Sequence, residues 1–105
     1  ICEVKIVNGY PFLVNDNNVT TAGIKFAGEF LGAENIEELD LRMTGEDFAY
    51  YSQVFPATFY RLGITDKAKT INSPLHSPTF NIDENALKTG MATMAWIALS
   101  FLLET

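Results

Sequence analysis

The sequence is poor in the residues that build many functional sites. Its 105 residues include a single cysteine and a single histidine. With Cys2 alone, no internal disulfide and none of the paired-cysteine zinc patterns can form. One unpaired cysteine is typical of a reducing compartment, so we expect a cytoplasmic location.

Basic charge and long apolar runs are also scarce. Lys and Arg number 7 against 13 Asp and Glu, giving a formal net charge of −6. No basic stripe is interleaved with aromatic residues, and no polybasic patch occurs, so we expect neither nucleic acid nor a membrane surface as partner. The longest apolar run, residues 91–103, is interrupted by Thr93 and Ser100 and is shorter than a bilayer span. We interpret it as part of a buried helix.

Hydrophobic residues make up 48% of the chain, enough for one packed domain or part of one. Residues 1–7 alternate between apolar and polar side chains, which predicts a half-buried strand. Residues 35–41 and 57–62 are further strand candidates, the latter because it is rich in aromatic residues and threonine.

Helical periodicity occurs in three places between these segments. Apolar residues recur at helical spacing from Val19 to Leu31, after a polar cluster that can cap a helix and before Gly32. A second helix is predicted from a capping box at residues 44–47 until Pro56. A third begins near Asn81 or Asp83 and runs to about Glu104.

The order is therefore strand, helix, strand, helix, strand, a loop over residues 63–73, and a helix. This order predicts a mixed α/β fold, with a mixed sheet and flanking helices.

His76 is the first candidate site residue. It lies between Pro74 and Pro78, whose fixed φ angles stiffen the loop around it. Imidazole is the commonest transition-metal ligand, and a stiff loop holds such a ligand at one distance and angle. A lone histidine is more commonly a surface or hydrogen-bonded residue, and a zinc site needs three or four protein ligands.

The turn Thr44-Gly45-Glu46-Asp47 is the second candidate. A glycine at a helix entrance exposes backbone N–H groups that can hold a carboxylate or an oxyanion. The alternative is an ordinary helix cap, in which Glu46 only complements the helix dipole. No Gly-rich phosphate loop, nucleophile elbow or nucleophile–base pair can be assembled from the sequence.

Three segments together resemble a known family. They are TGEDFAYY (residues 44–51), the YRLG turn after VFPATF, and LHSPTFNIDENALKTG (residues 75–90). They are similar to the C-terminal part of the metal-dependent N-acyl-amino-acid amidohydrolases, which include hippurate hydrolase, N-acetyl-diaminopimelate deacetylase and plant indole-acetyl-amino-acid hydrolases. YPFLVND (residues 10–16) resembles the segment where that family's chain leaves its small lid domain.

The resemblance implies a division of the chain and a chemistry. Residues 1–14 would be the last strand of the lid and a hinge, and residues 15–105 part of an α/β catalytic domain. The family binds two divalent metal ions per active site (Zn, Mn, Co or Ni are candidates) and hydrolyses N-acyl amino acids or dipeptides with metal-activated water. By position in the motifs, His76 would be a metal ligand, and Gly45 and Glu46 would line the substrate site.

The sequence also departs from the family pattern. This chain lacks the segments that carry the family's Cys-x-His ligands, its Glu-Glu pair with the general base, and a further histidine. We therefore expect no catalytic residue in this segment, and we expect that the chain alone neither holds two metal ions nor hydrolyses an amide. We also expect association between copies through unpaired apolar surface. Two alternatives stay open: a small acidic α/β interaction module without catalysis, and a metal site shared between subunits of an oligomer.

Overall fold

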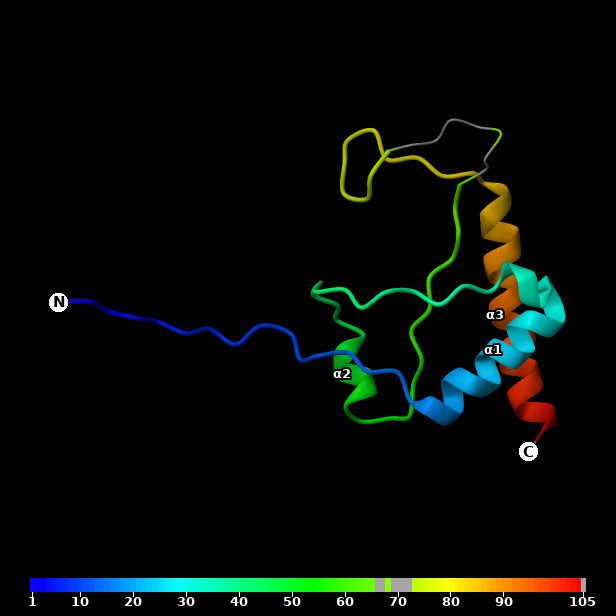
Figure 1. Ribbon diagram of the computed structural model, residues 1–105, viewed down its shortest axis with the longest axis horizontal. Coiled ribbons are helices and arrows are strands. Elements are labelled where there is room, and N and C mark those ends of the chain that lie inside the picture. The colour runs from blue at the N-terminus through cyan, green and yellow to red at the C-terminus, as the bar shows by residue number, and fades with distance from the viewer. Residues whose placement is uncertain (66–67, 69–72, 105) are drawn as a thin grey trace.

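The structure, a computed structural model, describes residues 1–65, 68 and 73–104 (Figure 1). Its elements in chain order are α1 (Asn17–Leu31), the short 3-10 helix η1 (Ala33–Asn35), α2 (Ala49–Ser52) and α3 (Asn85–Leu103). Helices α1 and α3 pack against each other, whereas the N-terminal residues run away from this pair as an extended chain (Figure 1). The predicted loop over residues 63–73 lies in part outside the described residues.

Helix α1 forms where the sequence predicts it, although it begins at Asn17 rather than at Val19. The earlier start follows from its cap, because the Asp16 side chain accepts a hydrogen bond of 2.9 Å from the backbone N–H of Val19. At the other end Gly32 has a φ of 89°, which favours glycine. Its N–H donates to the carbonyl of Gly28 at 2.9 Å and closes the last turn.

The core lies between α1 and α3 and is aromatic. Phe26 is 2% exposed. Its ring meets that of Phe101 edge to face, with the ring centres 5.1 Å apart. Nearby, the ring of Phe30 stacks on Trp96 with centres 6.1 Å apart. Aromatic pairs bury apolar area and also favour particular ring geometries. These two pairs therefore fix which faces of the two helices meet.

An ion pair also joins the two helices. The ammonium group of Lys25 contacts the carboxylate of Glu104, just past the end of α3. The hydrogen bond that Lys25 donates to this carboxylate raises the pKa of Lys25 above its usual range. Because the pair is in contact with water, we expect it to add little to stability.

Helix α3 starts later than the sequence predicts. It begins at Asn85, whose N–H donates to the Asp83 side chain at 3.2 Å. Asp83 and Glu84 therefore precede the first turn instead of forming it. The small residue Gly90 lets a neighbour approach, since a Cβ atom at this position would lie 2.7 Å from Cδ2 of Leu62.

The predicted α/β fold class is wrong for the part of the chain that the structure describes, which is helical and contains no strand. Residues 1–7, 36–41 and 57–62 are not helical, but they are not joined into a sheet. Alternation and β-propensity specify which face of a strand is apolar, whereas a sheet also needs a neighbouring strand to hydrogen-bond with. Residues 1–7 are exposed throughout and find no such neighbour among the described residues.

The predicted capping box and long second helix are also corrected. Helix α2 spans only Ala49–Ser52, its N-cap is Phe48, and no side chain caps it. Thr44 and Asp47 thus do not form the expected reciprocal pair. A short helix with one buried residue, Ala49, gains too little from packing to extend to Pro56.

Helix α3 is not the buried helix that the sequence predicts. It buries Thr93 and Ser100 and exposes most of its long apolar side chains, among them Met91, Leu102 and Leu103. By length and composition only, α3 is long and apolar enough to cross a membrane. Of its most apolar 18-residue stretch, 11% is buried. That is weak evidence, because core helices of soluble proteins pass the same test.

The extended N-terminal residues make the molecule open. The radius of gyration is 17.3 Å, compared with about 13 Å for a compact domain of this length. The division of the chain at residue 14 stays a prediction.

Candidate functional site

Glu46 lies in the turn that leads into α2. One oxygen of its half-buried carboxylate accepts a hydrogen bond of 3.2 Å from the backbone N–H of Phe48. Its backbone carbonyl accepts from the N–H of Ala49, also at 3.2 Å. Glu46 thus closes this turn through both its side chain and its backbone, so the orientation of its carboxylate depends on the shape of the turn.

Gly45, the preceding residue, is exposed at the surface of the same turn. Its neighbour across the chain is Tyr10, whose ring carbon Cδ2 would lie 3.3 Å from a Cβ atom at position 45. The sequence did not indicate this contact, because it joins two residues far apart in the chain. The only local signal is that Tyr10 precedes Pro11, which restricts the backbone of Tyr10 to extended conformations.

His76 is exposed and lies directly before the turn of residues 77–80, which is closed by a hydrogen bond of 3.1 Å from the N–H of Phe80 to the carbonyl of Ser77. It has a φ of 62° and is the one non-glycine residue with positive φ in the described part of the chain. This left-handed conformation costs an L-residue about 1–2 kcal/mol. Histidine is among the residues that adopt it more readily, and strained residues of this kind cluster at functional sites.

The structure does not bring the predicted site residues together. The loop that carries His76, yellow in Figure 1, lies apart from the turn that leads into α2. Within the described ranges, no three His, Cys, Asp or Glu side chains cluster closely enough to hold a metal ion. His76 can supply one ligand, whereas a zinc site needs three or four. The described residues therefore do not form a complete metal centre by themselves.

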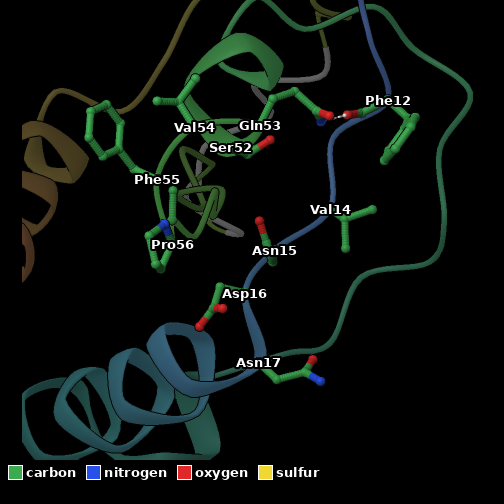
Figure 2. Close-up of a pocket in the computed structure, with 11 residues that line it drawn as sticks. Phe12, Val14, Asn15, Asp16, Asn17, Ser52, Gln53, Val54, Phe55 and Pro56 are labelled. Atoms are coloured by element: carbon green, nitrogen blue, oxygen red, sulfur yellow. Dashed lines mark hydrogen bonds between the residues drawn. The ribbon is translucent and has the colours of Figure 1, made fainter.

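A different feature, an open hollow of about 560 Å³, lies between residues 12–17 and residues 52–57 (Figure 2). Figure 2 shows the amide of Gln53 reaching across it, where it donates to the carbonyl of Phe12 at 2.9 Å. Its one carboxylate, that of Asp16, already caps α1. The hollow contains neither His76 nor the Gly45–Glu46 turn, and we assign it no chemistry.

Asn15 links the N-terminal segment to residues 57–59 through hydrogen bonds. Its amide group donates to the carbonyl of Phe59 at 2.9 Å and accepts from the N–H of the same residue at 2.7 Å. Next to it, the N–H of Asp16 donates to the carbonyl of Ala57 at 2.9 Å. In a sheet, the backbone of residues 57–59 would hydrogen-bond to a neighbouring strand. Here the hydrogen bonds to Asn15 and Asp16 hold these residues in place without a sheet.

Comparison with known proteins gives consistent results over nearly the whole chain. The family model described as peptidase family M20/M25/M40 matches residues 1–100. An Arabidopsis thaliana protein named IAA-amino acid hydrolase ILR1-like 4 is 35% identical over 90% of this chain and 22% of its own length. Thermostable carboxypeptidase 1 of Saccharolobus solfataricus is 33% identical over 95% of this chain and 25% of its own length.

One relative carries a different name. Putative glutamate–cysteine ligase 2-3 of Rhodococcus jostii is 34% identical over 88% of this chain but only 12% of its own length. No solved structure matches the chain. The chain spans about a quarter or less of the curated relatives described here. With a family model covering residues 1–100, the chain belongs to peptidase family M20/M25/M40.

Proposed function

We propose that this chain is the C-terminal part of a metal-dependent hydrolase that cleaves the amide bond of N-acyl amino acids or small peptides. Family membership supports this proposal, together with relatives named as an amino acid hydrolase and a carboxypeptidase. The observation that carries it is His76, an exposed imidazole in a left-handed turn within the LHSP stretch.

In this proposal the chain contributes a ligand and part of the substrate site. His76 would bind one of two divalent metal ions, with Zn, Mn, Co and Ni as candidates, and the other ligands would come from outside the chain. Bound metal ions of this kind polarise a carbonyl oxygen and lower the pKa of a bound water. Gly45 and Glu46 would line the substrate site, and the general base would also lie outside this chain.

The test uses the full-length protein that carries this sequence. It should hydrolyse N-acyl amino acids, lose activity when a chelator removes divalent metal, and recover when metal is returned. The chain of residues 1–105 should be inactive in the same assay. Metal-independent hydrolysis by the full-length protein, or none with any N-acyl amino acid or dipeptide, would refute the proposal.

The alternative is a small acidic interaction module without catalysis. The exposed apolar side chains of α3 favour it, since Met94 is 61% and Leu102 74% exposed. In the hydrolase these side chains would be covered by the rest of the protein or by a second copy. A full-length protein without amidase activity and without bound metal would favour the interaction module.

A further inference from the structure

The ring of Tyr10 lies close to the place that a side chain at position 45 would occupy. In the described part of the chain the one glycine with positive φ is Gly32, so the backbone at Gly45 does not itself require glycine. A Cβ atom at Gly45 would lie 3.3 Å from Cδ2 and 3.9 Å from Cε2 of Tyr10. The first of these distances is shorter than an ordinary van der Waals contact. The ring thus occupies the space beside Gly45 that a side chain at this position would need.

Tyr10 is itself held in place by α2 and the residue that ends it. Its ring meets Tyr50 edge to face, with the ring centres 5.8 Å apart and the planes at 73°. One helical turn further on, Gln53 donates to the carbonyl of Phe12 at 2.9 Å (Figure 2). Positions three apart lie on the same face of a helix, so both contacts hold the segment of residues 10–12 along one face.

We propose that Tyr10 is a positioning residue for the Gly45–Glu46 turn, an inference that rests on the proposed function. The ring limits the movement of the Gly45 backbone. That backbone orients Glu46, whose carboxylate accepts from the N–H of Phe48 at 3.2 Å. Tyr10 belongs to the segment predicted to be the hinge from the lid. The contact therefore ties the position of that segment to the shape of the substrate-lining turn.

The contacting atoms are ring carbons, so the ring and not the hydroxyl should matter. In the full-length protein, Tyr10→Phe should keep kcat/KM within about twofold, whereas Tyr10→Ala should lower it about tenfold, because small misplacements of binding groups are costly. The matched control is Phe12→Ala on the same segment. Phe12 holds Gln53 through its backbone carbonyl, so this variant should stay within about twofold of the wild type.

A double-mutant cycle tests the contact itself. Gly45→Ala should lower kcat/KM in the wild type, because its Cβ displaces the ring of Tyr10, but should cost little more in the Tyr10→Ala protein. As a readout independent of activity, hydrogen exchange at the Phe48 amide should be faster in Tyr10→Ala and unchanged in Tyr10→Phe.

The outcomes separate the two proposals. If the wild type hydrolyses no amide, the proposed function fails, and this inference fails with it. If the wild type is active but the two substitutions are additive, or Tyr10→Ala leaves kcat/KM unchanged, only the role of Tyr10 is refuted. The same holds if Tyr10→Ala loses metal and thermal stability along with activity, because the residue would then be structural.

Discussion

Phe26→Ala tests the packing that holds the described chain together. Phe26 is 2% exposed and is the largest side chain that is fully buried in the described residues. Removing a buried phenylalanine costs about 3–5 kcal/mol, including about 0.5–1.5 kcal/mol for an aromatic pair such as that with Phe101. Because a domain is stable by only about 5–15 kcal/mol, this single change should remove a large share of the free energy of unfolding.

The matched control is Phe30→Ala on the same helix. Phe30 stacks on Trp96 but is 44% exposed, so its loss should cost about half as much. Urea unfolding followed by far-ultraviolet circular dichroism measures both variants. A cost for Phe26→Ala no larger than that for Phe30→Ala would refute the assignment of the core to the α1–α3 contact.

Two further predictions concern the ends and the packing of the helices. Asp16→Ala removes the cap of α1 and should lower the free energy of unfolding by about 1 kcal/mol, whereas Asp16→Asn should retain most of it; equal losses in urea unfolding would contradict the capping role. Gly90→Val places atoms where Leu62 now lies and should cost about 1–3 kcal/mol, and Leu62→Ala should recover part of that cost; no recovery in the double variant would exclude this contact.

The approximate positions of α1 and α3 could be predicted from the sequence because the signals of a long helix are local. The apolar stripe, the polar cap and Gly32 all lie within α1 or next to it, and the hydrogen bonds of a helix stay inside the segment. Residues 1–7 carry an equally clear alternation, but a strand is completed by another part of the chain. The alternation shows which face of residues 1–7 is apolar, but it does not show which other strand would pair with them.

The predicted site shows the same division between local and long-range information. The position of His76 in a turn and of Glu46 at a helix entrance followed from prolines, a glycine and short motifs. The left-handed φ of His76 and the ring of Tyr10 over Gly45 had no counterpart in the local pattern. The metal ligand and substrate-lining roles of these residues stay predictions, because they depend on groups that the described residues do not include.

The central claim is that His76 binds a metal ion, and metal content tests it most directly. The clean variant is His76→Asn, because asparagine also adopts a left-handed φ, so the imidazole is removed while the turn is kept. Thr79→Ala, in the neighbouring turn of residues 77–80, is the control. By elemental analysis of the full-length protein, we expect His76→Asn to lose bound metal and most of the activity, while Thr79→Ala retains both. Unchanged metal stoichiometry in His76→Asn would contradict the assignment.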